Sequence, residues 1–140
     1  MNIVALAGGT GAAKLVRGLA RLIDPRELTV IVNTGDDALV WGLHVSPDLD
    51  TICYALSGAL DTDRGWGLRD ESFHALARMA RFGEPTWFNL GDRDLATHLH
   101  RSRLLREGRT LTEATASVAS GVGTGADRKS TRLNSSHGII

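Results

Sequence analysis

The first 32 residues constrain the fold most strongly, because they follow the pattern of a strand, a glycine-rich turn, a helix and a second strand. The apolar run Ile3–Ala7 predicts a strand that is covered on both faces. Residues 13–23 predict an amphipathic helix, and Leu28–Val32 a second buried strand. A strand-helix-strand unit of this length places its two strands in parallel, with a right-handed crossover.

The chain beyond this unit predicts more helices than strands. Helix signals cover residues 46–57, where Ser46 is the expected capping hydroxyl, and residues 72–82, 92–106 and 110–120, the last with a capping box. A short strand is predicted at residues 87–90. The alternation of strands and helices indicates an α/β fold with a parallel sheet.

Composition bounds the class of protein without identifying it. The 140 residues fit one domain, and 16 basic residues balance 16 acidic ones, so bulk charge gives no sign of a nucleic-acid partner. The single cysteine, Cys53, excludes an internal disulfide framework, favours a reducing cytoplasm and reads as a core residue. The apolar N-terminal run is too short to span a membrane.

The last part of the chain changes character after Ala126. Residues 127–137 have no helix or strand period, and they resemble the in-frame translation of a sequencing-library adapter rather than a natural disordered tail. We therefore expect residues 1–126 to form the N-terminal part of a domain and residues 127–140 to be a non-native tail.

The glycine loop of Gly8, Gly9, Thr10 and Gly11 suits a phosphate group. Glycine lets the backbone approach an anion, and the N–H groups at the start of the next helix point towards it. The loop fits neither the Walker A motif nor the dinucleotide fingerprint, because Lys14 is followed by leucine and stands where a third glycine is needed. A plain tight turn is the alternative.

One pair of carboxylates follows the second strand, and another lies at the start of the next helix. Asp36 and Asp37 could hold a ribose hydroxyl or a divalent cation, or they could be solvated turn residues. Asp48 and Asp50 could bind a ligand, or they could only stabilise the positive end of a helix.

The basic residues and histidines give weaker indications. The four arginines of residues 92–106 are expected to form mostly a solvated helix face, although Arg93, at the helix start, could bind phosphate. The histidines show no metal-ligand spacing and read as surface or core residues: His44, His74, His98 and His100.

Five segments together are more specific than any loop alone. They occur in one order along the chain, at residues 8–11, 33–37, 46–51, 64–67 and 90–98. This series resembles the 2-phospho-L-lactate transferase family, called CofD in archaea and FbiA in actinobacteria. A related nucleotide-sugar-binding group shares the glycine loop and the paired acids, but we do not expect it to share the segments at 46–51 and 90–98.

The resemblance implies a Rossmann-like three-layer fold and a Mg²⁺-dependent transfer of a phospholactyl or phosphoenolpyruvyl group. The donor is linked to guanosine diphosphate, the acceptor is the ribityl hydroxyl of the deazaflavin Fo, and GMP is released. The glycine loop would then face the diphosphate, and Asp36 and Asp37 would lie at the metal. Asp50 would bind the Fo hydroxyls and aid their deprotonation, and Asn89 would contact Fo.

Other implications of the resemblance concern the site's edges and the state of the protein. Asp92 and Arg93 would shape the site, and Trp66 would either stack on the deazaflavin or belong to the core. Family members are more than twice as long, so we expect this chain to be an incomplete, inactive fragment of a cytoplasmic homodimer. The alternatives are a nucleotide-sugar-binding regulator and an NAD-dependent dehydrogenase with Asp36 as its ribose acid.

Overall fold

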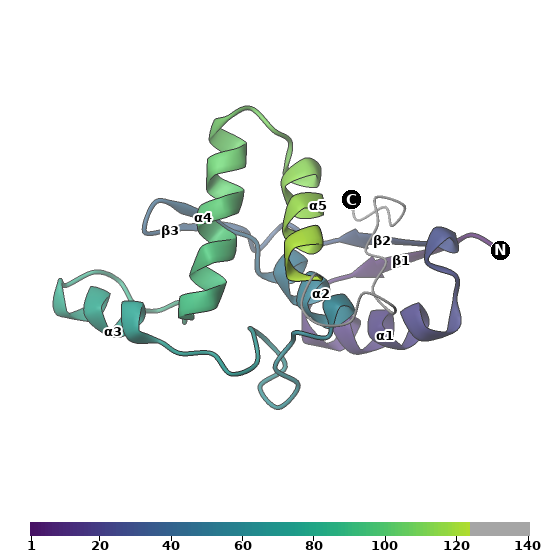
Figure 1. The fold of residues 1–140 in the computed structure, drawn as a ribbon, viewed down its shortest axis with the longest axis horizontal. Coiled ribbons are helices and arrows are strands. Elements are labelled where there is room, and N and C mark those ends of the chain that lie inside the picture. Colours follow the sequence, from purple (N-terminus) through teal and green to yellow (C-terminus); the bar gives the residue numbers. More distant parts are fainter. Residues whose placement is uncertain (124–140) are drawn as a thin grey trace.

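The computed structural model describes residues 1–123, and the predicted tail at residues 127–140 lies outside that range. The order of elements is strand β1, helix α1, a short 3-10 helix, strands β2 to β4, and helices α2 to α5 (Figure 1). Their bounds are β1 Ile3–Ala7, α1 Gly9–Leu22, η1 Pro25–Glu27, β2 Leu28–Val32, β3 Ala38–Val40, β4 Leu43–Val45, α2 Pro47–Ser57, α3 His74–Arg81, α4 Asp92–Arg106 and α5 Leu111–Val122.

The predicted strand-helix-strand unit is confirmed. β1 and β2 pair in parallel, in a register that places Ile3 opposite Leu28 and Ala7 opposite Val32. Helix α1 begins at Gly9, four residues before the predicted start, so most of the glycine loop forms its first turn. The α/β class is confirmed, and the two parallel strands are consistent with part of a Rossmann-like fold.

The β1–β2 sheet is covered on one face only, which corrects the prediction of strands buried on both. Ala7, Val30 and Val32 lie in the core with α1 and α2. On the opposite face Val4 is 60% exposed, Leu6 77% and Ile31 39%. Among residues 1–123 no segment packs over these side chains, and sequence could not reveal this, because an apolar run shows only that a strand suits burial.

Helix α2 is the central element of the fold, where it packs against α1, α5 and β2 (Figure 1). Most of its residues are buried, and the predicted core residue Cys53 is confirmed as fully inaccessible. The helix ends at Gly58, whose φ of 73° is the left-handed conformation that favours glycine. Ser46 occupies the N-cap position, but its side chain makes no capping hydrogen bond, so the prediction of a capping hydroxyl is wrong.

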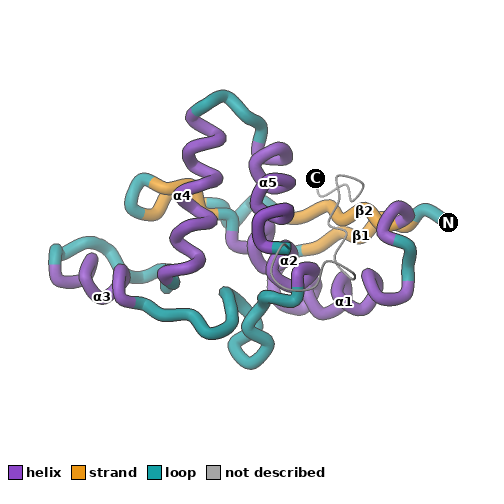
Figure 2. The backbone as a smooth tube through the Cα atoms, viewed as in Figure 1, coloured by secondary structure: helices purple, strands orange, loops and turns teal. Residues whose placement is uncertain are grey.

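Two details of the strand prediction differ from the structure. An antiparallel hairpin of β3 and β4, which was not predicted, turns at Trp41 and Gly42, both with positive φ. Residues 87–90 were predicted as a strand but form a bend and coil. Figure 2 shows the strands of the described chain confined to the β1–β2 pair and the small hairpin.

The last three helices form the other side of the molecule. α4 and α5 pack against each other, and the predicted capping box of α5 is confirmed, since Thr110 and Glu113 each accept a hydrogen bond from the other's backbone N–H. α3 extends away from the core, and none of its residues is buried. No helix in residues 1–123 has the length and apolar character needed to cross a membrane.

Candidate functional site

The N-terminal turn of α2 joins two groups of polar residues. Its residue Asp48 faces the glycine loop, where a Cβ on Gly8 would lie 3.5 Å from Asp48 Oδ2. Its residue Asp50 faces α4, where it contacts Arg101 and His98. Both aspartates are buried, at 8% and 4% exposure. The first turn of α2 therefore connects the glycine loop to a second polar cluster, which contains Asp50, His98 and Arg101.

The glycine loop presents free backbone donors to solvent. Gly8 is the N-cap of α1 with extended backbone, and no side chain caps the helix. The first turn contains no acidic residue, so no side chain of that turn competes with an external anion for these N–H groups. Gly9 has a φ of 66°, which favours glycine at this position. The arrangement suits a phosphate, and the alternative of a plain turn stays open.

Asn33 connects the glycine loop to the acids that follow β2. Its side-chain amide donates to Asp48 Oδ2 at 3.0 Å and to Asp36 Oδ2 at 3.2 Å. Its side-chain oxygen accepts from the backbone N–H of Gly35 at 3.1 Å, which shapes the turn. One amide thus holds two carboxylates beside each other, although they lie twelve residues apart in sequence.

Asp37 is held differently from Asp36. Its Oδ2 accepts from Ser46 Oγ at 2.7 Å and lies 3.0 Å from His44 Nε2. Its Oδ1 is buried and has no hydrogen-bond partner. A buried carboxylate oxygen without a donor costs free energy unless something positive meets it. A hard divalent cation such as Mg²⁺, which prefers oxygen ligands, would meet this need, and the assignment of Asp36 and Asp37 to a metal stays a prediction.

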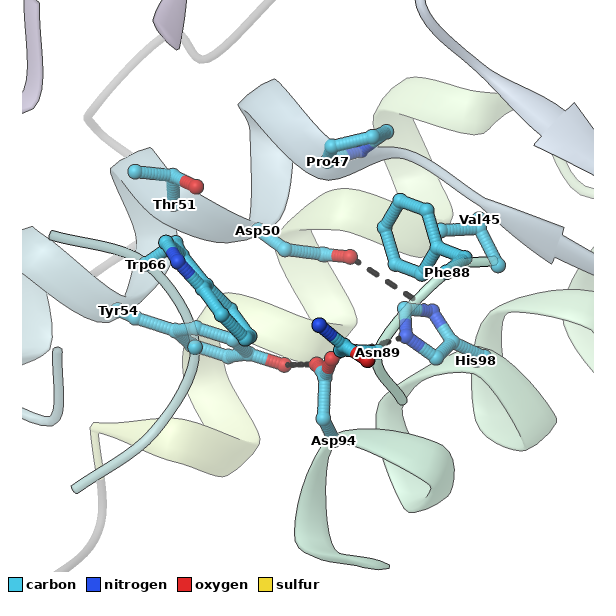
Figure 3. Close-up of a pocket in the computed structure, with 11 residues that line it drawn as sticks. Val45, Pro47, Asp50, Thr51, Tyr54, Trp66, Phe88, Asn89, Asp94 and His98 are labelled. Carbon is cyan, nitrogen blue, oxygen red and sulfur yellow. Dashed lines mark hydrogen bonds and ion pairs between the residues drawn. The ribbon is translucent and has the colours of Figure 1, made fainter. Parts of the chain in front are cut away.

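The second cluster lines a small cavity, which we call the Asp50 pocket, of about 50 Å³. Figure 3 shows Trp66 and Phe88 on either side of it, with Asn89 between them. Aromatic walls with a few convergent polar groups are typical of small-molecule sites. The lining residues are Val45, Pro47, Asp50, Thr51, Tyr54, Trp66, Gly67, Phe88, Asn89, Asp94 and His98.

Arg101 is the residue that the sequence placed wrongly. It was expected on a solvated helix face, but it is completely buried and binds both carboxylate oxygens of Asp50. Arg103 and Arg106 are exposed, as predicted. Burial raises the pKa of Asp50 to about 6, although Arg101 and His98 both act to lower it. Burial lowers the pKa of Arg101, but Asp50, with smaller effects of Tyr54 and Cys53, raises it, so the pKa lies above its ordinary value.

His98 connects Asp50 to a second acid. His98 Nε2 lies 3.2 Å from Asp94 Oδ2, and His98 Nδ1 lies 3.7 Å from Asp50 Oδ2. Tyr54 donates its hydroxyl to Asp94 Oδ1 at 2.5 Å. Burial raises the pKa of Asp94, but the adjacent His98 ring brings the pKa below the ordinary value. Burial, with Asp50 and Asp94 nearby, raises the pKa of Tyr54 well above its ordinary value.

These groups were missed because each was considered alone. Asp94, Thr97, His98 and Arg101 stand at spacings of three and four, so they lie on one face of α4. We call them the polar stripe of α4. All four are buried. Polar residues spaced three and four apart along a helix are a sequence signal for a buried polar network. Metal-ligand spacing is a different signal and does not indicate such a network.

The start of α4 is hydrogen-bonded to the start of α3, and we call this contact the joint at the start of α4. Asp92 accepts hydrogen bonds from Ser72 Oγ at 2.6 Å and from two backbone N–H groups at the start of α3. These bonds lower the pKa of Asp92. Glu71 in turn accepts from the backbone N–H groups of Arg93 and Asp94, at 2.9 and 3.0 Å. A direct substrate role of Asp92 or Arg93 stays a prediction.

The other predicted substrate residues lie at the pocket or near it. Asn89 lines the Asp50 pocket and is exposed. Trp66 also lines it, is 37% exposed, and has the Arg64 guanidinium 4.8 Å from its ring centre, so it is not a core tryptophan. The structure thus brings Asp50, Asn89 and Trp66 to one cavity. Asp48, in the same turn of α2 as Asp50, lies next to the glycine loop.

Comparison with known proteins adds a family match. Residues 3–127 match the family model described as 2-phospho-L-lactate transferase CofD. The chain is 47% identical over 124 residues to a 2-phospho-L-lactate transferase of Methanocorpusculum labreanum, an alignment covering 89% of this chain and 41% of that protein. It is 51% identical over 117 residues to a phosphoenolpyruvate transferase of Kitasatospora aureofaciens, covering 82% of this chain and 36% of that protein.

A mycobacterial relative matches with similar identity and coverage. The chain is 46% identical over 129 residues to a phosphoenolpyruvate transferase of Mycobacterium sp. (strain KMS), covering 82% of this chain and 39% of that protein. The chain therefore spans about two fifths of the length of the curated relatives that it matches.

Proposed function

This chain belongs to the 2-phospho-L-lactate transferase CofD family, and on that premise we propose that it forms the acceptor side of a phosphoryl-transfer site. The group transferred is phospholactyl or phosphoenolpyruvyl, from a guanosine-diphosphate-linked donor to the deazaflavin Fo. One observation supports this most directly: the first turn of α2 presents Asp48 to the glycine loop and Asp50 to an aromatic-walled pocket. A diphosphate and a polyhydroxyl acceptor could then meet at one helix end.

The proposed reaction forms one bond and breaks one. The oxygen of a ribityl hydroxyl of Fo attacks the phosphorus that bears the lactyl or enolpyruvyl group. The bond from that phosphorus to the bridging oxygen breaks, and GMP leaves with the bonding electron pair. The hydroxyl proton passes to a carboxylate and then to solvent. Catalysis of this kind depends on positioning and on neutralising phosphate charge.

Asp50 is the group that we assign to the acceptor hydroxyl. It lines the pocket, and the raised pKa of about 6 makes it a better proton acceptor than an ordinary aspartate while still ionised at neutral pH. Asn89 would add an amide donor and acceptor to the same hydroxyl chain. Trp66 would cover the deazaflavin ring, for which its half-open position suits it.

Charge at the glycine loop supports a role for a cation. The carboxylates of Asp36 and Asp48 meet at Asn33 beside a loop suited to a phosphate, and Asp37 follows Asp36 in the chain, so like charges there would repel an anion. Asp36 and Asp37 would hold Mg²⁺, with the unpartnered Oδ1 of Asp37 as one ligand. When bound, Mg²⁺ would neutralise the negative charge of the diphosphate.

The experiment uses the protein expressed from its gene extended past the codon for Ala126 to the length of the relatives. It is incubated with Fo, a guanosine-diphospho-lactate or -enolpyruvate donor and Mg²⁺, and GMP and the phosphodiester are sought by mass spectrometry. We expect product that disappears with EDTA and in Asp50→Ala. A folded protein that gives no product and no Fo binding, but is stabilised by UDP-sugars in a thermal shift, would instead be a nucleotide-sugar-binding regulator.

A further inference from the structure

Arg101 is a buried cation that the proposed reaction does not use. Its side chain is fully inaccessible, and it comes from α4, whereas the carboxylate that it binds comes from α2. Removing an arginine from water costs several kcal/mol unless its donors are satisfied. Here both terminal nitrogens bind the Asp50 carboxylate, and Nη1 also approaches the carbonyl oxygen of His44 at 3.3 Å, whereas Nε has no hydrogen-bond partner.

The contacts of Arg101 fix the hydrogen positions on His98. Arginine can only donate, so His98 Nδ1, at 3.3 Å from Arg101 Nη1, must accept. The ring hydrogen then sits on Nε2, which lies 3.2 Å from Asp94 Oδ2 but makes no hydrogen bond. Asp94 also accepts from Tyr54. Arg101 therefore donates to His98 Nδ1, and this contact sets the orientation of the ring, with Nε2 on the side of Asp94.

The same contacts argue against a cation in this cluster. Ligand atoms of Asp50, Asp94 and His98 lie within 4.8 Å of one another, a spacing that could hold a metal ion. However, the guanidinium of Arg101 already supplies the positive charge, and Nδ1 of His98 is engaged with it. A metal ion would be repelled by the arginine. The Asp50 pocket is therefore better suited to the hydroxyl groups of a neutral ligand.

We propose that Arg101, held in place by His98, is a positioning residue that orients the Asp50 carboxylate and keeps it ionised for the acceptor hydroxyls. A two-pronged contact fixes the plane of the carboxylate, so the lone pairs that Arg101 does not use have a defined direction. The charge of Arg101 opposes the effect of burial, which favours the protonated acid. The identity of the acceptor rests on the proposed function.

The test compares Arg101→Lys, which keeps the charge without the two-pronged geometry, with Arg101→Met, which loses both. Arg103→Met is the matched control, because Arg103 is on the same helix but exposed and bonded to Glu107. Fo binding and the KM values of Fo and donor are measured on the extended protein. We expect the KM of Fo to rise about tenfold in Arg101→Lys and more in Arg101→Met, with the donor KM within about twofold, and no change in the control.

Two further readouts separate positioning from a merely structural role. In Asp50→Asn/Arg101→Met, Fo binding should be no weaker than in Asp50→Asn, because Arg101 acts through Asp50. In the wild type, Fo binding should rise with pH through about 6. The charged or titratable groups that face Asp50 are Arg101, His98 and Asp94 from α4 and Cys53 and Tyr54 from α2. Loss of the arginine should move the pH midpoint upward.

The outcomes are distinguishable. If the wild type binds Fo and Arg101→Lys shows the wild-type KM and pH midpoint, the positioning role is overturned and the transferase proposal stands. If Arg101→Met does not fold, Arg101→Lys and the double variant decide the question, because both avoid an unpaired buried carboxylate. A folded wild type that binds no Fo overturns the proposed function and this inference with it.

Discussion

Arg101 and Asp50 bind each other through two nitrogens and two oxygens at the centre of the molecule, with Nη1 3.2 Å from Oδ2. Arg101 is fully buried, and Asp50 is 4% exposed. The contact joins α4 to α2, the two helices that line most of the Asp50 pocket. It therefore links the packing of the fold to the position of the acid that we assign to the acceptor.

The first prediction concerns the stability of this pair. Arg101→Met leaves a buried carboxylate without its partner, so we expect the free energy of unfolding to fall by about 3–5 kcal/mol. Asp50→Leu/Arg101→Met removes both charges and should recover most of that loss. Urea denaturation measures both. A double variant that loses as much as the two single variants added together would show that the pair is not a coupled unit.

The second prediction concerns the pH dependence of stability. The pKa of Asp50 is raised in the folded protein to about 6, from about 3.9 in an unfolded chain. The folded state therefore binds the proton more tightly, and this contribution is complete below pH 4 and is lost as pH rises through 6. Its size is on the order of 3 kcal/mol. We expect the difference in unfolding free energy between wild type and Asp50→Asn to follow this window.

Comparison with Asp50→Asn is needed because other acids act in the opposite direction. Asp94 has a lowered pKa, so the stability that it contributes is present above its unfolded pKa and is lost as pH falls through its folded value. The difference between the two proteins isolates Asp50. A difference that does not vary between pH 4 and 7 would contradict the raised pKa.

The third prediction concerns the metal. Asp37→Asn replaces the unpartnered carboxylate oxygen by a neutral group of the same shape. We expect the Mg²⁺ concentration for half-maximal transfer to rise at least about tenfold. The thermal unfolding midpoint without metal should change little or rise, because a buried charge is removed. Asp63→Asn, in an exposed turn, is the control. An unchanged Mg²⁺ requirement in Asp37→Asn would exclude Asp37 as a ligand.

The fourth prediction concerns the joint at the start of α4. A Cβ on Gly91 would lie 2.1 Å from Glu71 Cγ, so Gly91→Ala must displace the side chain that accepts from the first N–H groups of α4. We expect a loss of about 1 kcal/mol, the usual contribution of a helix cap. Glu71→Ala should lower the free energy of unfolding by about as much, and adding Gly91→Ala to Glu71→Ala should lower it little further.

Gly18→Ala is the matched control for Gly91→Ala. Gly18 lies inside α1, and a Cβ added there would meet no neighbouring atom within 4 Å, so alanine should stabilise the protein by about 0.5–1 kcal/mol. Opposite signs in the two thermal unfolding experiments are the expected result. A stabilising Gly91→Ala would show that Glu71 does not cap α4.

Local patterns predicted much of the fold because they are decided within a few residues. The apolar runs gave β1 and β2 at their observed bounds, and the capping box of α5 and the glycine that ends α2 were read from side-chain chemistry alone. The β3–β4 hairpin was missed because its strands are three residues each, too short for a period to show.

The sequence by itself determined which residues we assign to the chemistry, since Asp36, Asp37, Asp50 and the glycine loop stand in motifs whose spacing is local. Only the tertiary structure decided which of them meet. Arg101 lies 51 residues from Asp50, and an arginine on a helix reads as solvated until another helix covers its face. Burial and partners are properties of two elements packed together, so the pKa of Asp50, the hydrogen position on His98 and the pocket between α2 and α4 arise only with packing.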